Sequence, residues 1–318
     1  MNVRRLIPGA ALAAVTALTL GATSACSSTS SAADESGKLD VVASFYPLQF
    51  LAEEIGGDKV AVTTLTEPGQ EPHDLEISAK QTAQLQESDV ALYLQGLQPS
   101  VDEAVKQSEI KTKVDAASLT TLEEHGNEVG GHAAEHDDEH GEEEGGKDPH
   151  VWLDPVRYAE IAEGVGRAFE KADPDNAATY QANTSALVKK LDALNSRFEN
   201  GLKNTKTKVF ITTHAAFGYL AERYGLTEEA INGLDPESEP SANRVRDLEK
   251  MAKADGVTTV FYETLVSDKT AKTIAEDANL KTDVLDPVEG ITEKSRGDDY
   301  IAVMESNLKA LETALGAK

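Results

Sequence analysis

Three histidines stand at positions where a folded chain could bring them together: His73, His150 and His214. His73 and His150 each follow a proline in an irregular segment, and His214 ends an apolar, β-branched stretch that we expect to be a strand. Taken singly, each could be a surface or hydrogen-bonded histidine. Together they indicate a shared task, because three imidazoles and one carboxylate form a common tetrahedral zinc site.

The fourth ligand of such a site has a positional candidate. Asp286 follows the last predicted strand of the chain and precedes a proline. In open α/β sheets, ligands bind beyond the carboxyl ends of the strands, and this position fits that rule. The alternative is that Asp286 is a turn residue, since Asp-Pro is a frequent turn former.

Strands and helices alternate along both halves of the chain. We expect strands at 39–45, 60–65, 89–94, 208–213, 257–263 and 282–285, and helices at 48–55, 78–86, 215–224, 241–254, 268–278 and 298–315. This alternation predicts an α/β fold class with two lobes, each a mainly parallel sheet flanked by helices. Between the halves, apolar residues at three- and four-residue spacing predict a helix over 174–204, long enough to join the lobes rigidly.

These patterns divide the chain into five parts. They are a signal peptide at 1–25, a tether at 26–38, an N-terminal α/β lobe at 39–172, a linking helix at 173–205 and a C-terminal α/β lobe at 206–318. The N-terminal lobe contains a disordered loop at 123–147, which is rich in histidine and acidic residues.

The N-terminus indicates export. Arg4 and Arg5 precede an apolar run without acidic residues, which is typical of a secretory signal peptide. The single cysteine, Cys26, follows this run and precedes a Ser/Ala-rich tether, so we expect it to be the lipid attachment point of a lipoprotein. The alternative is an ordinary signal peptide cleaved near Ala25. Either reading places the mature protein outside the cytoplasm, and the first also anchors it to the membrane through lipid.

The chain is strongly acidic, with a formal net charge of −26. This charge argues against nucleic acid as a partner, because binding to phosphates needs a cationic surface. Part of it lies in the 123–147 loop, whose four histidines alternate with carboxylates. We expect these histidines to bind further zinc weakly, the alternative being a solvated acidic spacer: His125, His132, His136 and His140.

Several motifs occur in the order found in one known family. They are Pro-His-Asp-Leu-Glu at 72–76, Asp-Pro-His-Val-Trp-Leu-Asp-Pro at 148–155, Thr-His-Ala-Ala-Phe-Gly-Tyr-Leu at 213–220, Tyr-Gly-Leu at 224–226, Phe-Tyr-Glu-Thr-Leu at 261–265, and Tyr300 with Met304, Asn307 and Leu308. The chain resembles the solute-binding lipoproteins of bacterial ABC importers for zinc and manganese. That resemblance implies a metal site between two α/β lobes joined by a long helix.

The resemblance also implies the ligands and the metal. It places ligands at His73, His150 and His214, with an acidic residue of the C-terminal lobe that we map onto Asp286. Manganese-type members typically carry a carboxylate where this chain has His214, so zinc is the expected ion. Imidazole ligands also suit zinc, whereas manganese prefers oxygen. Glu71 and Glu263 are candidate auxiliary groups.

The expected function is therefore capture of Zn2+ and its delivery to an ABC importer permease and, through it, to the ATPase. A metallochaperone donor is a further partner that this function allows, and we expect a monomer. Four protein ligands leave no position for an activated water, so we do not expect an enzyme. The alternatives are a manganese or other divalent-metal binder, a periplasmic metallochaperone, or an adhesin with the same site.

Overall fold

The computed structural model of the protein describes residues 37–126, 128–129 and 147–318. The predicted signal peptide, Cys26 and the loop histidines His132, His136 and His140 lie outside the described residues. Within the described ranges, no helix has both the length and the hydrophobicity that a membrane span requires.

The first sheet is formed by the N-terminal part of the chain. Its strands, all parallel in the order β2-β1-β3-β4, are β1 (Leu39–Ala43), β2 (Val60–Thr64), β3 (Val90–Tyr93) and β4 (Thr112–Asp115). Side chains alternate between its faces. Val41 and Ala43 pack in a cluster with α1 (Tyr46–Gly56) and α4 (Pro155–Ala172), whereas Val42 packs with α2 (Ala79–Glu87) and α3 (Pro99–Gln107). Helices therefore cover both faces.

The second sheet is formed by the C-terminal part, together with one short strand from the N-terminal part. Its order is β5-β7-β6-β8-β9, with β5 (Glu128–Val129), β6 (Val209–Thr212), β7 (Thr227–Ala230), β8 (Thr259–Tyr262) and β9 (Lys281–Val284). Only β5 runs antiparallel, along β7. One face packs on α7 (Ala242–Ala254) and α8 (Lys269–Ala278), and the other turns toward α6 (Gly218–Tyr224) and α9 (Tyr300–Leu315). The predicted fold class is confirmed.

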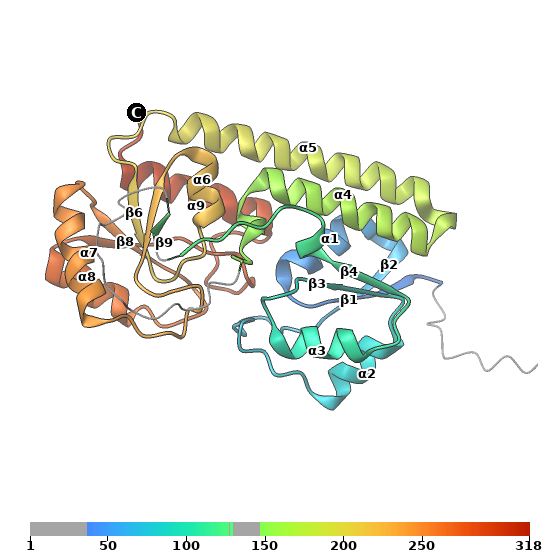
Figure 1. Cartoon of the computed structure of the whole chain (residues 1–318). Helices are drawn as coiled ribbons and strands as arrows, with labels where there is room; N and C mark the ends of the chain where they lie inside the picture. The colour runs from blue at the N-terminus through green and yellow to red at the C-terminus, as the bar shows by residue number, and fades with distance from the viewer. Residues whose placement is uncertain (1–36, 127, 130–146) are drawn as a thin grey trace, which may run out of the picture. The chain divides into compact units, whose positions relative to one another are not determined.

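One long helix, α5 (Ala177–Leu202), runs beside α4 and contacts helices that flank each of the two sheets (Figure 1). It touches α1 next to the first sheet, and α6 and α9 next to the second. The sequence predicted a helix at 174–204, but Pro174–Asn176 forms a separate 3-10 turn before α5 begins. Three other short turns of this kind occur at Gly57–Lys59, Ala116–Ser118 and Val151–Leu153.

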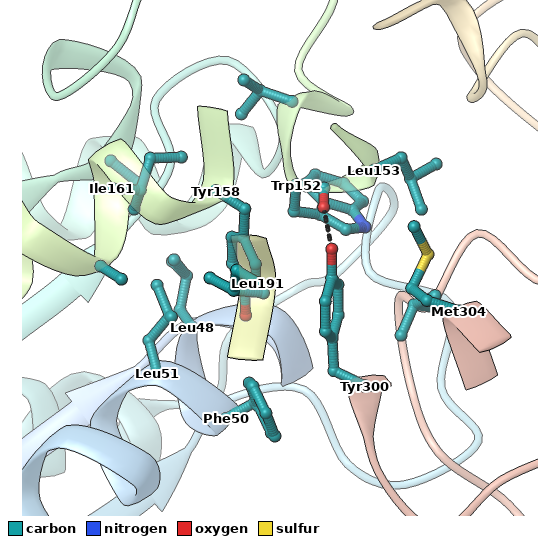
Figure 2. Close-up of a cluster of buried hydrophobic side chains, with 14 of the residues drawn as sticks. Leu48, Phe50, Leu51, Trp152, Leu153, Tyr158, Ile161, Leu191, Tyr300 and Met304 are labelled. Atoms are coloured by element: carbon teal, nitrogen blue, oxygen red, sulfur yellow. Dashed lines mark hydrogen bonds between the residues drawn. The ribbon is translucent and has the colours of Figure 1, made fainter. Parts of the chain in front are cut away.

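The two sheets share one continuous hydrophobic core (Figure 2). Trp152 is a buried member of this core, and its ring packs edge-on against Phe45 at 5.0 Å between centroids. The Tyr300 hydroxyl donates to the Trp152 carbonyl over 2.6 Å, and the Trp152 indole N–H donates to the Pro287 carbonyl over 2.7 Å. Because His150 precedes Trp152 by two residues and Glu289 follows Pro287 by two, these bonds fix two polar side chains close to each other.

Candidate metal centre

Four side chains converge at the carboxyl ends of the strands. They are His73, His150, His214 and Glu289, and each offers a ligand atom within 4.8 Å of the other three. Three of the four side chains are at most 1% exposed, and His73 is 11% exposed. The three histidines singled out from the sequence therefore lie together, with a glutamate as the fourth group.

The second sheet brings several groups of this centre to one edge. His214 lies two residues after β6, Glu263 directly follows β8, and Glu289 lies in the segment after β9. Because β6, β8 and β9 are parallel neighbours, the loops at their carboxyl ends meet. His73 comes from the loop after β2 of the first sheet, and His150 from the turn that precedes Val151–Leu153.

The spacing of the four ligand atoms matches a tetrahedral zinc ion. Bonds of about 2.0–2.1 Å to zinc hold tetrahedral ligand atoms about 3.3–3.4 Å apart. The Nε2 atom of His150 lies 3.3 Å from that of His73 and 3.4 Å from that of His214. Oε1 of Glu289 lies 3.4, 3.4 and 3.6 Å from the Nε2 atoms of His73, His150 and His214. Four of these five edges of the tetrahedron thus have the required length, and the fifth, from Glu289 to His214, is slightly longer at 3.6 Å.

Two carboxylates orient the histidines from behind. Asp148 accepts from Nδ1 of His150 over 2.8 Å, and Glu263 accepts from Nδ1 of His214 over 2.8 Å. All four side chains are buried. A proton held on Nδ1 leaves the Nε2 lone pair free to face a metal, and the carboxylate makes that nitrogen more basic. Glu263 was an auxiliary candidate from the sequence, and its position agrees with that role.

The ionisation of these groups is strongly perturbed. Burial raises the pKa of Glu289, but the three histidine rings, whose Nε2 atoms lie 3.4–3.6 Å from its Oε1, outweigh burial and bring the pKa well below its usual range. Burial lowers the pKa of His214, but Glu263 and then Glu289 more than offset it, so the pKa lies well above 6.5. The pKa of His150 is also raised, because Asp148 and Glu289 together outweigh burial. The metal-free centre therefore favours the protonated forms of His150 and His214 beside an ionised Glu289.

Glu289 lacks the hydrogen bonds that a buried carboxylate usually has, which is expected of a metal ligand. Both of its carboxylate oxygens are buried, and neither has a hydrogen bond of normal geometry to any described residue. A buried carboxylate whose close polar neighbours are histidine rings beyond normal hydrogen-bond geometry is costly unless a positive charge neutralises it, either on the histidines or on a bound cation. The donor set of three imidazole nitrogens and one carboxylate oxygen fits zinc and leaves the occupied centre with one net positive charge before Asp148 and Glu263 are counted.

Asp286, the fourth ligand expected from the sequence, is not in this group. Its Oδ1 accepts from the Val288 N–H over 2.8 Å and its Oδ2 accepts from the Thr264 hydroxyl over 3.0 Å. Burial raises the pKa of Asp286 to about 6. Both oxygens are thus engaged, one by the loop after β9 and the other by the segment after β8, and the geometry assigns the fourth position to Glu289. Glu289 stands in the same segment after β9, but no spacing singled it out among the many glutamates of the chain.

His125 is built into the wall of the centre. Its Nδ1 donates to Oδ2 of Asp148 over 2.7 Å, so this aspartate bridges His125 and His150. The imidazole packs edge-on against Tyr219 at 4.5 Å, and it fills the space where a Cβ on Gly218 would stand. The sequence grouped His125 with the weak loop ligands, but the structure engages one of its two nitrogens with Asp148.

Glu71 borders the more exposed side of the centre. Its Oε2 accepts from the backbone N–H of His73 over 2.9 Å, and its Oε1 is buried without a hydrogen-bond partner. Burial and the neighbouring Glu289 raise the pKa of Glu71 to about 6. His73 has the most exposed side chain of the four converging residues, so the centre is least shielded from solvent on this side.

Comparison with known proteins agrees with the site. A family model described as zinc-uptake complex component A, periplasmic, matches residues 41–314. The zinc-binding lipoprotein AdcA of Streptococcus pneumoniae is 38% identical over 286 residues, which cover 87% of this chain and 56% of AdcA. The chain thus spans just over half the length of that relative. The high-affinity zinc uptake system protein ZnuA of Bacillus subtilis is 37% identical, and the match covers 92% of both chains.

A solved structure has the same fold. The Zn(II)-bound ZnuA-like domain of S. pneumoniae AdcA superposes with a TM-score of 0.73 at 35% sequence identity. The match covers 88% of this chain and 99% of that domain. Together with the family match over most of the residues, this shows that the chain belongs to the family of the periplasmic zinc-uptake complex component A.

Proposed function

We propose that the protein captures Zn2+ outside the cytoplasm and delivers it to the permease of an ABC importer. The observation that carries the proposal is the convergence of three imidazole Nε2 atoms and one carboxylate oxygen at tetrahedral zinc spacing. The names of the relatives, which refer to zinc binding and zinc uptake, support the same ion.

The proposed role is binding rather than catalysis. Four protein ligands fill a tetrahedral shell, whereas a catalytic zinc keeps an open position for water or substrate. Manganese is disfavoured because it prefers oxygen ligands and three of the four ligands here are nitrogens. Delivery requires that the ion can leave the centre. The partial exposure of His73, beside Glu71, supports an exit on that side.

The lipid anchor and the loop remain parts of the proposal. Cys26 would hold the mature protein at the membrane close to the permease, and His132, His136 and His140 would bind further zinc weakly. All four residues lie outside the described ranges. We also propose that the zinc-bound protein acts as a monomer and that the permease, with its ATPase, is its main partner.

The test begins with the purified mature protein. We expect about one tightly held zinc per chain and displacement of Mn2+ by Zn2+ in a competition titration. His214→Ala should weaken zinc binding by at least about 100-fold, because it removes one of four bonds and leaves Glu263 buried beside an empty space. His132→Ala is the matched control and should keep the tight site. Tight one-to-one binding by His214→Ala would contradict the proposed ligands.

Delivery needs a test in cells that naturally produce the protein. Removal of its gene should lower uptake of radioactive zinc under chelation. Expression of the wild-type protein should restore uptake, and the His214→Ala variant should not. Equal restoration by both would contradict the proposed transport function while leaving zinc binding itself intact.

A further inference from the structure

The segment that carries Glu289 has an unusual backbone. Val288 has a φ of +59°, in the left-handed region that β-branched residues avoid. The other non-glycine residue with positive φ among the described residues is Asn279, at the end of α8, and asparagine tolerates this conformation. Val288 is fully buried, so contacts within the protein, and not solvent, determine its backbone conformation. A strained residue next to a functional side chain suggests that the surroundings enforce the strain for a purpose.

The contacts that enforce this conformation centre on Asp286. Its Oδ1 accepts from the N–H of Val288 two residues ahead, which closes an Asx-type turn, and its Oδ2 accepts from Thr264 at the end of β8. Asn307 of α9 donates to the Asp286 carbonyl over 2.7 Å and accepts from its N–H over 2.9 Å. Trp152 holds the next carbonyl, that of Pro287. Each of the three residues before Glu289, from Asp286 to Val288, therefore takes part in at least one of these hydrogen bonds.

The turn determines where Glu289 points. A residue at positive φ redirects the chain, and an extended or right-handed Val288 would carry the following side chain in another direction. With Val288 as it is, Oε1 of Glu289 lies 3.4–3.6 Å from all three histidine Nε2 atoms. We infer that Asp286 is a positioning residue: it stabilises the left-handed turn at Val288 and thereby aims the Glu289 carboxylate at the metal. This inference rests on the proposed zinc-binding function.

Substitutions at Asp286 separate this role from that of a ligand. Asparagine keeps an oxygen that accepts from the Val288 N–H, and its amide can still pair with the Thr264 hydroxyl. Asparagine lacks the negative charge that a zinc-binding aspartate supplies. Alanine removes the turn contact altogether. A positioning role thus predicts that Asn is tolerated and Ala is not, whereas a ligand role predicts that both fail.

The experiment measures zinc affinity by competition with a chromophoric chelator, and ligand geometry by the visible spectrum of the Co2+-loaded protein. We expect Asp286→Asn to bind within about threefold of wild type, with an unchanged Co2+ spectrum. Asp286→Ala should bind about 10- to 100-fold more weakly, the usual loss when a group that orients a metal ligand is removed. Asp283→Asn, an aspartate on β9 that pairs with Arg296, is the matched control and should change nothing.

A double-mutant cycle shows whether Asp286 acts through Glu289. In a Glu289→Ala background, Asp286→Ala should add less than about threefold, because the carboxylate that it positions is gone. Circular dichroism of the metal-free variants checks that each is folded.

Three results would overturn the inference. The first is an equal loss of affinity in Asp286→Asn and Asp286→Ala. The second is a loss of 10-fold or more in Asp286→Asn alone. The third is full additivity of the Asp286 and Glu289 substitutions. Absence of tight zinc binding in the wild type would instead overturn the proposed function, and with it this inference.

Discussion

Zinc affinity should depend steeply on pH, and this dependence should already be present at neutral pH. In the metal-free centre, the pKa of His214 lies well above 6.5 and that of His150 is also raised, because nearby carboxylates more than offset their burial. A raised pKa means that the histidine holds its proton at every pH below that value. Zinc must displace this proton to reach the Nε2 lone pair, so affinity falls as the pH falls.

The size of the effect follows from the number of protons displaced. One proton released on binding weakens the affinity about tenfold for each pH unit lost, and two protons weaken it about a hundredfold. His214 accounts for the first proton, and His150 for part of a second, because charged His214 lowers its pKa again. Acidification from about pH 7 to pH 6 should therefore weaken binding by between about 10- and 100-fold.

Two titrations check this expectation. Competition against a chelator of known proton affinity gives the zinc affinity between about pH 6 and pH 8. Calorimetry in two buffers of different ionisation enthalpy counts the released protons directly, and His132→Ala should release the same number as wild type. A constant affinity from about pH 8 to pH 6.5, with a decline only below that range, would refute the reasoning, since it would mean that the histidines keep the pKa of free imidazole.

Three further perturbations test other parts of the account. Asp148→Asn should weaken zinc binding by about 10- to 100-fold, because it removes the carboxylate that orients His150. His125→Ala should weaken binding by less, because His125 contacts Asp148 and not a ligand. Chelator competition measures both affinities, and a larger loss in His125→Ala would contradict this account. Deletion of residues 130–146 should keep the single tight zinc and reduce weakly bound zinc in equilibrium dialysis, and an unchanged total would leave the loop histidines without their proposed role. Trp152→Ala should lower the free energy of unfolding by about 3–5 kcal/mol in urea titrations, because it empties the shared core; a loss below about 1 kcal/mol would argue against one continuous core.

The sequence predicted the fold class because most strands are apolar runs between helical segments. β7 escaped prediction because it reads Thr-Glu-Glu-Ala, which is polar. In the structure both glutamates of β7 are buried: Glu228 accepts from Thr212 and the Phe217 N–H, and Glu229 pairs with Arg244. Only tertiary contacts explain such a strand, so a local pattern cannot reveal it. The helices α3 and α4 and the strands β4 and β5 were likewise not foreseen.

The candidate site was predictable where the residue type is rare. Histidines are scarce in the part of the chain expected to fold, and three of them stood near strand ends or in loops, so they could be singled out. Glutamates are common, and nothing in the spacing distinguishes Glu289. Its selection depends on the left-handed turn at Val288 and on burial beside three histidines. Asp286 was predicted from its place after the last strand to be the fourth ligand, but both of its oxygens accept hydrogen bonds and the geometry gives that position to Glu289.

The central claim is that one zinc ion is held by His73, His150, His214 and Glu289. X-ray absorption at the zinc edge tests it most directly, on the one-to-one complex of the protein that lacks residues 130–146, where loop histidines cannot contribute. We predict four nitrogen or oxygen ligands at about 2.0–2.1 Å, with the outer-shell scattering of three imidazoles. A shell of five or six ligands, or fewer than three imidazoles, would contradict the claim.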